Sequence, residues 1–304
     1  QESVMMSDLT ADFKAFAVQA GADLIGVADP SRFSDWAPER SPMSIFPDAK
    51  AVVAVARRIT RGTLRGNEEG TNFNTYQSFG YHWLDNEFLA LTTFECVEFL
   101  EDNCWEATPL FPFPAEAYPQ GIPVREGAPA PNVYPDFDHV AVACGLGEIG
   151  VNGHLLTPRF GSRQRLQIIL TDAPLQPDPI WTEPICRRCL ACANSCPLDA
   201  IATDDFDELT IAGKTMHIGK IDYDKCRVCK NGACANRYHS AGKPDRLGAL
   251  CNRSCVNALE LRDATTDSFE QPFRKRDPWG LDEMGRLVKV TVRSAHNPGS
   301  QEGR

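Results

Sequence analysis

The sequence predicts a mixed α+β fold, in which an α/β layer domain over residues 1–175 precedes a cysteine-rich domain over residues 176–262. Helix-like and strand-like segments alternate up to about residue 175, which is typical of layered domains. From Pro177 the chain changes to short segments that are rich in cysteine and lack a long apolar period. Beyond Arg262 it is polar and charged, so residues 263–304 are expected to form a polar C-terminal tail.

Short apolar runs predict the strands of the first domain. "LIGVA" (24–28) is one, and "AKAVVAVA" (49–56) is apolar enough to be covered on both faces. "RLQIILTD" (165–172) predicts a further strand. "HVAVAC" (139–144) is also interpreted as a strand, since it is a short and almost continuous apolar run.

Two segments have the spacing of helices. Ser7 is a suitable N-cap for a helix that ends near Ala20, where Gly21 follows. A longer helix is expected to end near Asn103, and its apolar period is formed by Leu84, Phe88, Leu91 and Phe94. Residues 109–135 hold eight prolines, so they are expected to form an extended loop that lines a pocket.

Composition limits the classes of function. The net charge of −10 is unfavourable to broad contact with a phosphate backbone, so nucleic acid is not an expected partner. No stretch approaches the roughly 18 apolar residues of a transmembrane helix, and no export signal precedes the first helix. The expectation is a cytoplasmic protein that does not interact with membranes.

The cysteines indicate metal. Twelve cysteines are many for a cytoplasmic chain, in which structural disulfides are rare, and nine of them lie between Cys186 and Cys255. "CRRCLACANSCP" (186–197) has the spacing C-x2-C-x2-C-x3-C-P of bacterial ferredoxins. In that run three thiolates bind one [4Fe–4S] cluster, and the fourth cysteine binds the other cluster of a two-cluster protein. The sequence therefore predicts two [4Fe–4S] clusters.

A second cysteine set downstream completes the ligands. Cluster one is expected to use Cys186, Cys189, Cys192 and Cys255. Cluster two is expected to use Cys196, Cys226, Cys229 and Cys251. Nine cysteines are present for eight positions, and Cys234 is an alternative ligand in place of Cys226 or Cys229. Structural zinc also favours C-x2-C pairs, but a zinc ion needs only four tetrahedral ligands and does not require the full C-x2-C-x2-C-x3-C-P spacing.

A glycine motif precedes the cysteines. "ACGLGEIGVNG" (143–153) contains G-x-G-x-x-G, the pattern of loops that bind the pyrophosphate of a dinucleotide. Gly153 and Pro158 interrupt the helix that such a loop should open, and no second βαβ half follows. A tight turn between packed elements is the simpler interpretation of these glycines.

The glycine motif and the cysteines together resemble a known superfamily. "GLGEIGVNGHLLTPRFGSRQRLQIILTDAPL" (145–175), followed by the ferredoxin run, is similar to the corrinoid-dependent iron–sulfur reductases, which include the reductive dehalogenases and epoxyqueuosine reductase. The matched residues are Gly145, Leu146, Gly147, Gly150, Asn152, Thr157, Pro158, Gly161, Arg163, Arg165, Leu166, Thr171, Asp172 and Leu175. The resemblance is good over about 140–260 and weaker over 7–60.

The resemblance implies a nitroreductase-like α/β domain that holds base-off cobalamin, with a ferredoxin-like domain docked against it. The residues implied to contact the corrinoid are Gly145, Leu146, Gly147, Gly150, Asn152, Gly161, Arg163 and Arg165. Glycines would let the backbone approach the corrinoid closely. Tyr134 is the first candidate for the proton donor, ahead of Asp136, Asp138 and His139, because dehalogenases use a tyrosine.

The function implied is that of a cobalamin-dependent reductase, similar to reductive dehalogenases, that receives electrons from a ferredoxin, a flavodoxin or a reductase and reduces a small organic substrate. Two positions depart from the superfamily pattern. Val151 stands where relatives often have a basic residue, and Pro131 stands where epoxyqueuosine reductase has its acidic donor. These departures favour an alternative, a corrinoid-free electron-transfer or redox-sensing protein with two clusters. Epoxyqueuosine reduction on tRNA agrees least with the acidic charge.

Overall fold

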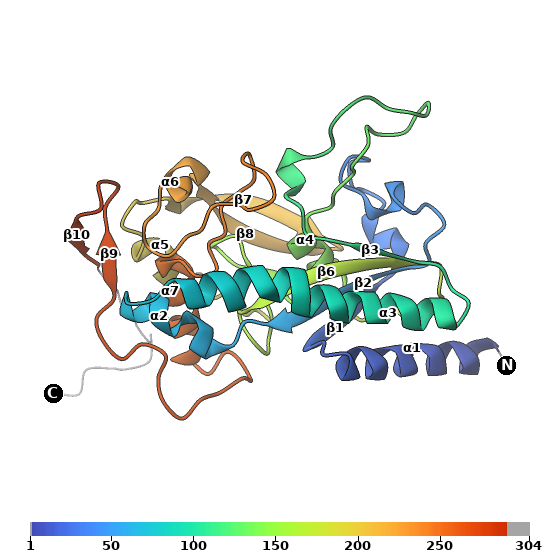
Figure 1. Cartoon of the computed structure of the whole chain (residues 1–304), viewed down its shortest axis with the longest axis horizontal. Coiled ribbons are helices and arrows are strands. Elements are labelled where there is room, and N and C mark those ends of the chain that lie inside the picture. The colour runs from blue at the N-terminus through green and yellow to red at the C-terminus, as the bar shows by residue number, and fades with distance from the viewer. Residues whose placement is uncertain (1, 291–304) are drawn as a thin grey trace.

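A computed structural model of the chain describes residues 2–290, without the side chains of residues 2–8, and shows a mixed α+β fold (Figure 1). Its centre is a four-stranded sheet in the order β1–β2–β6–β3, in which every neighbouring pair is antiparallel. The strands are β1 (Leu24–Ala28), β2 (Ala51–Arg58), β3 (Ala107–Leu110) and β6 (Gln164–Thr171). The three strands predicted at 24–28, 49–56 and 165–172 are confirmed. β3 contains Pro109, which is tolerated because β3 lies at the edge of the sheet.

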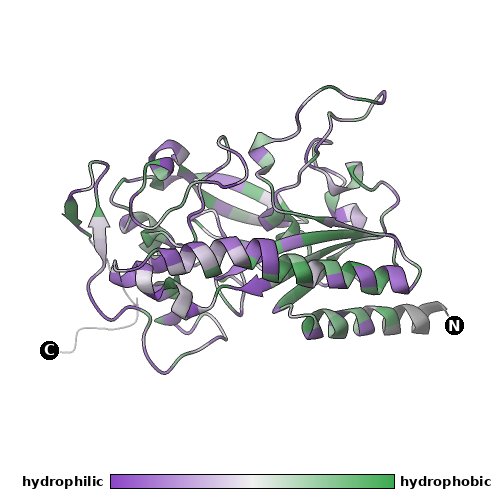
Figure 2. Cartoon of the chain, viewed as in Figure 1, coloured by the Kyte–Doolittle hydropathy of each residue, from purple (hydrophilic) through white to green (hydrophobic). Residues whose placement is uncertain are grey.

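Two helices cover one face of this sheet. α1 (Glu2–Gln19) and α3 (Ala90–Asp102) lie side by side, and Phe13, Val53 and Leu100 are fully buried between these layers (Figure 1). Figure 2 shows the strands of the sheet as the most hydrophobic part of the chain. The predicted start of α1 at Ser7 is wrong: the helix begins at Glu2, because the residues before Ser7 include good helix formers.

The long helix departs from the predicted period. Two π-helical segments, η4 (Tyr76–His82) and η5 (Leu84–Leu89), precede α3. Each π-turn holds an extra residue, which rotates the following side chains away from the face that a 3.6-residue period predicts. Leu84 and Leu89 are therefore buried, whereas Phe88, Leu91 and Phe94 are exposed.

The opposite face of the sheet is covered by α4 (Phe137–Ala143), so the strand predicted at 139–144 is wrong. Asp136 caps this helix by accepting a hydrogen bond from the backbone N of His139. The segment is buried between the sheet and the hairpin of β7 (Ile201–Ile211) and β8 (Lys214–Ile221). Because it is covered on all sides, its sequence has no amphipathic period that distinguishes a helix from a strand.

The cysteine-rich part holds α5 (Ala191–Asn194), α6 (Tyr223–Arg227) and α7 (Leu250–Glu260), and α5 packs on α7. The described part of the predicted tail, residues 263–290, packs on the body: Phe273 is fully buried, and Arg274 pairs with Glu68 at 2.6 Å. Residues 291–304 lie outside the described residues. The short elements are η1 (Pro30–Phe33), η2 (Pro42–Ser44), η3 (Arg61–Leu64), α2 (Arg65–Glu69), η6 (Ala115–Ala117), β4 (Glu148–Ile149), β5 (Leu155–Leu156), β9 (Trp279–Leu281) and β10 (Leu287–Lys289). Across residues 2–290, no helix has both the length and the hydropathy of a membrane span.

Candidate functional site

The cysteines expected for cluster one face a common space. Cys186, Cys189, Cys192 and Cys255 line one small cavity, which Val151, Leu156 and Leu259 close on other sides. Three of these cysteines come from the segment around α5, and Cys255 comes from α7. Glu148 fixes the backbone where the cysteine segment begins. Its Oε1 accepts hydrogen bonds from the backbone N of Ile185 (2.8 Å) and of Cys186 (2.6 Å).

The cysteines expected for cluster two lie together beside the first set. Burial raises the pKa of Cys226 to about 11 and that of Cys251 to about 12, and in both cases the neighbouring thiols of Cys196 and Cys229 add to the shift. Cys196 thus lies among the second set, although it follows Cys192 by only four positions. The two sets adjoin, because the thiols of Cys251 and Cys192 are close enough to affect each other.

Cys234 lies apart from both sets. Its backbone forms a bridge with Asp245, and its side chain packs against a cluster that contains Tyr76. Among residues 2–290, all cysteines are free thiols, and no three His, Cys, Asp or Glu side chains converge closely enough to hold a single metal ion. Four thiols around a wider space suit a [4Fe–4S] cluster better than zinc, which binds four sulfurs at about 2.3 Å.

The glycine motif forms close packing within the chain. A Cβ on Gly147 would lie 1.9 Å from the backbone O of Leu156, and a Cβ on Gly145 would lie 2.2 Å from the O of Pro179. The motif follows α4 and leads into the short β4–β5 hairpin, so it lacks both the preceding strand and the following helix of a dinucleotide loop. The dinucleotide interpretation is therefore wrong, and the tight-turn interpretation agrees with the structure.

The eight residues implied to contact a corrinoid do not form one cradle. At Gly150 and Gly161, a Cβ would meet Leu156 or Leu259 of this chain at 2.9 and 2.6 Å. Leu146 packs against the core beneath the sheet. Asn152 lines the cavity of the first cysteine set instead.

The two arginines of this group point to different places. Arg163 is buried, forms an ion pair with Asp267 at 2.5 Å and donates to the backbone O of Ile59. Arg165 lines a different cavity, described below. The side chains and glycines named for the corrinoid thus contact other parts of the chain and do not form a cradle that fits it, and corrinoid binding stays a prediction.

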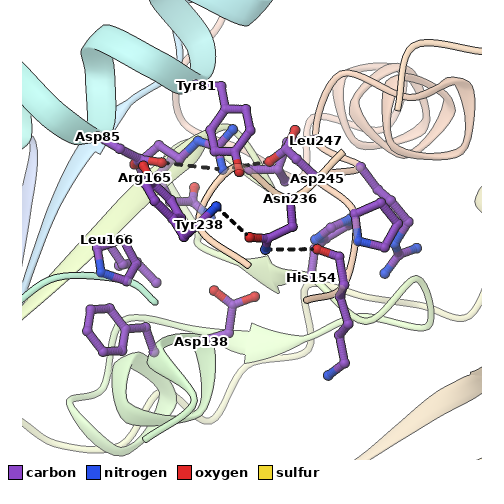
Figure 3. A pocket seen from close by; sticks show the side chains of 16 residues that line it. Tyr81, Asp85, Asp138, His154, Arg165, Leu166, Asn236, Tyr238, Asp245 and Leu247 are labelled. Atoms are coloured by element: carbon purple, nitrogen blue, oxygen red, sulfur yellow. Dashed lines mark hydrogen bonds and ion pairs between the residues drawn. The ribbon is translucent and has the colours of Figure 1, made fainter. Parts of the chain in front are cut away.

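A polar cavity of about 210 Å³ lies where β6 and the π-helical turns meet the loop of residues 236–247 (Figure 3). Arg165 organises one end of it. Its guanidinium forms ion pairs with Asp245 at 2.6 Å and Asp85 at 3.9 Å, donates to the hydroxyl of Tyr76 at 2.9 Å and lies over the ring of Tyr81. Tyr238 and Leu166 form walls, and His154 lies at the end away from Asp85 (Figure 3).

Burial shifts the protonation of the acids in this cavity. It raises the pKa of Asp85 to about 7, against the opposing charge of Arg165. It also raises the pKa of Asp138 to about 6, and the neighbouring carboxylate of Asp136 adds to this effect. His154 has its pKa lowered well below the usual range by burial and by Arg246, so its ring is neutral at pH 7. Asp138 is thus an acid that retains its proton closer to neutral pH than an exposed carboxyl does.

The predicted donor Tyr134 lies outside the lining of this cavity. Its ring packs against Phe113 at 5.4 Å and Tyr118 at 5.3 Å, and burial raises its pKa. Asp138, one of the alternatives named from the sequence, lines the cavity. Of the proline-rich loop 109–135, Pro112 contributes to the lining. Asp85 and Asp245 have no spacing that could have identified them, because they come from segments 160 residues apart.

No protein-family profile matches the chain. The tetrachloroethene reductive dehalogenases of Desulfitobacterium hafniense and Dehalobacter restrictus are each 44% identical over 148 residues, which cover 46% of this chain and 27% of theirs. The epoxyqueuosine reductase of Cyclobacterium marinum is 28% identical over 156 residues, which cover 46% of this chain and 49% of that protein. The chain thus matches only about a quarter of the length of the dehalogenases.

Solved structures of the same two kinds are similar. A reductive dehalogenase, described in connection with B12-dependent dehalogenation, gives a TM-score of 0.49 at 18% identity over 93% of this chain and 40% of that one. An epoxyqueuosine reductase with a tRNA stem loop gives a TM-score of 0.42 at 22% identity over 64% of this chain and 53% of that one.

Proposed function

Because the chain is homologous to the reductive dehalogenases and epoxyqueuosine reductases, both of which are reductases, we propose that it is an iron–sulfur reductase of the dehalogenase type. In this proposal, residues 176–262 hold two [4Fe–4S] clusters, and residues 1–175 provide most of the cavity in which a small organic molecule is reduced. The observation that carries the proposal is the division of eight cysteines into two adjoining sets beside that cavity.

The clusters, when bound, would supply electrons one at a time at a potential set by their surroundings. The chain contributes the rest. Glu148 orients the first cysteines through two backbone N–H groups, and Lys214 balances its charge at 2.9 Å. Val151 and Leu156 place apolar groups against the first set, which excludes water from it.

Asp138 would deliver the proton of the reduction. Reductive removal of a halogen breaks the carbon–halogen bond, consumes two electrons and one proton, forms a C–H bond and releases halide; removal of an epoxide oxygen breaks two C–O bonds and consumes two electrons and two protons to give an alkene and water. Asp138 lies in the cavity, its Oδ2 accepts a hydrogen bond from the backbone N of Leu155 at 3.2 Å, and its carboxyl retains a proton near pH 6. The electrons would come from a low-potential protein donor such as a ferredoxin, a flavodoxin or a reductase.

No step of this proposal uses a corrinoid, because the residues implied to hold one do not fit it. The cavity of about 210 Å³ is also smaller than the roughly 300–1,000 Å³ of sites for drug-sized ligands, and a corrinoid is larger than such ligands. The same observation supports the second candidate function, a two-cluster electron-transfer or redox-sensing protein. The polar cavity favours the reductase over this candidate, since electron transfer between proteins needs no internal site for a small molecule.

The proposal is tested by turnover. After anaerobic reconstitution with iron and sulfide, the protein is supplied with reduced methyl viologen and with a panel containing a halogenated alkene, a halogenated aromatic and an epoxide. Substrate-dependent oxidation of the viologen, with release of halide where halogen is present, is the expected result. The Asp138→Asn variant should keep its clusters and lose most of this rate. Oxidation that does not depend on any small molecule, but does depend on a protein acceptor, would support the second candidate.

A further inference from the structure

One end of the cavity carries buried side-chain nitrogen atoms that have no hydrogen-bond partner among the described residues. Arg246 is 3% exposed, and its Nη2 donates to the backbone O of Asn152 at 2.9 Å. Its Nη1 is buried without a hydrogen-bond partner among the described residues, and none of their carboxylates lies within ion-pair distance of it. The Nε2 of His154, which also lines the cavity, is buried without a partner as well.

Unpaired buried donors are unusual and costly. A buried donor without a partner costs about 1–3 kcal/mol, and more when the group is charged. Of two other arginines near the cavity and the clusters, Arg165 pairs with Asp245 at 2.6 Å, whereas Arg262, at the first cysteine set, donates to the backbone O of Ile185 and leaves its Nε without a partner. Arg246 lies over the ring of Tyr223 but pairs with no carboxylate of the described residues, and a buried cation of this kind at the wall of a cavity indicates an anionic ligand.

The same guanidinium faces the cysteines. It lies 5.3 Å from the ring centre of Tyr223 in α6, the helix that also carries Cys226, and the thiols of Cys251, Cys226 and Cys192 raise its pKa against the effect of burial. Cluster potentials depend on the net charge and the hydrogen bonds around the sulfurs, and a nearby cation favours the reduced state. Arg246 therefore lines the cavity and also lies near cysteines of both sets.

We propose that the Arg246–His154 end of the cavity binds the carboxylate of a small substrate, and that Arg246 couples this binding to the reduction of the clusters. The proposal rests on the proposed function, because it takes the cavity as the substrate site. A carboxylate on Arg246 neutralises part of the charge that favours reduced clusters, so binding lowers both cluster potentials. By reciprocity, reduction of the clusters weakens the binding of the carboxylate.

The opposite end of the cavity indicates which chemical group the ligand carries away from its carboxylate. Asp85 lies there with its Oδ1 unpaired, and Tyr81 and Tyr238 lie beside it (Figure 3). These groups suit a hydrogen-bond donor, such as a hydroxyl, on a molecule of about one ring. The volume of about 210 Å³ suits a group of about this size.

The test compares benzoate with benzamide, which has nearly the same shape and no charge. Calorimetric titration of the reconstituted protein should show benzoate binding at least tenfold more tightly than benzamide. Arg246→Gln should weaken benzoate at least tenfold, and Arg246→Lys should restore part of the affinity. Arg262→Gln is the matched control, because Arg262 lies at the first cysteine set and not in the cavity, and it should bind benzoate as the wild type does.

The coupling is measured separately by redox titration followed by EPR. Benzoate should shift the midpoint potentials of both clusters downward in the wild type and in Arg262→Gln, but not in Arg246→Gln. Equal affinity for benzoate and benzamide, unchanged binding in Arg246→Gln, or potentials that do not respond to benzoate would each overturn the inference. Failure of the proposed function is a different result: the reconstituted protein would then lack [4Fe–4S] signals, or would reduce no small molecule.

Discussion

Replacement of Cys196 by Ala tests how the cysteines are divided between the clusters. Cys196 follows Cys192 closely in the sequence, yet its thiol lies with Cys226 and Cys229. Its loss should therefore remove cluster two and leave cluster one, which lowers the iron content from about eight to about four per chain. Iron and sulfide analysis after anaerobic reconstitution measures this, and the EPR spin count of the reduced protein should fall by about half.

Double variants identify which cluster is lost. With the crossed assignment, adding Cys226→Ala to Cys196→Ala should leave about four irons, because both cysteines belong to the same cluster. Adding Cys186→Ala instead should leave almost none. The reverse pattern would refute the assignment, since Cys196 would then share a cluster with Cys186. Cys234→Ala is the control, and it should retain about eight irons because Cys234 lies apart from both sets.

Three further predictions concern stability, each measured by urea unfolding. Gly147→Ala places a Cβ against the backbone O of Leu156 and should lower the free energy of unfolding by about 3 kcal/mol, whereas Gly62→Ala, which has open space around it, should change it little. Asp267→Ala leaves the cation of Arg163 buried without its counter-charge and should cost about 2 kcal/mol, a value reduced from that of a fully buried pair because Asp267 is partly exposed. Asp138 has a pKa raised to about 6, so the stability that its protonated form contributes is complete below its ordinary pKa and is lost as the pH rises through about 6. Asp138→Asn should therefore be more stable than the wild type at pH 8, and this difference should shrink towards pH 5.5; a difference that does not depend on pH would contradict the assigned shift.

The sequence predicts those parts of the fold whose signal is local. β1, β2 and β6 are short apolar runs rich in β-branched residues, and their residue ranges agree with the structure to within two positions. The segment of α4 is equally apolar, but it is covered on all sides, so its periodicity carries no information about its type. The long helix is predicted, whereas its two π-helical segments are not, because an inserted residue has no periodic signal of its own; in the structure Tyr81 and Asn86 of these segments contact Tyr238.

In the candidate site, too, the part with a local sequence signal is predictable and the part formed by distant segments is not. Fixed spacings within the ferredoxin run predict the crossed division of the cysteines; in the structure the first set lines one cavity and the second set lies beside it, and the ligand assignment stays a prediction. The cavity has no such signature. Asp85, Asp138 and Asp245 become neighbours only when the fold joins distant segments, and nothing in the sequence indicates that Nη1 of Arg246 is buried at the cavity wall without a partner among the described residues. The corrinoid contacts were carried over from a resemblance, and the structure fills those positions with its own backbone and side chains.

The central claim is that two clusters, and not a corrinoid, serve a small-molecule cavity. Anaerobic reconstitution in the presence of reduced cobalamin, followed by desalting and by analysis of iron, sulfide and cobalt, tests it most directly. The account predicts about eight irons and eight sulfides per chain with no cobalt retained. One cobalt per chain with a base-off cobalamin spectrum would contradict it, and would mean that the chain forms a corrinoid site from residues other than those named above.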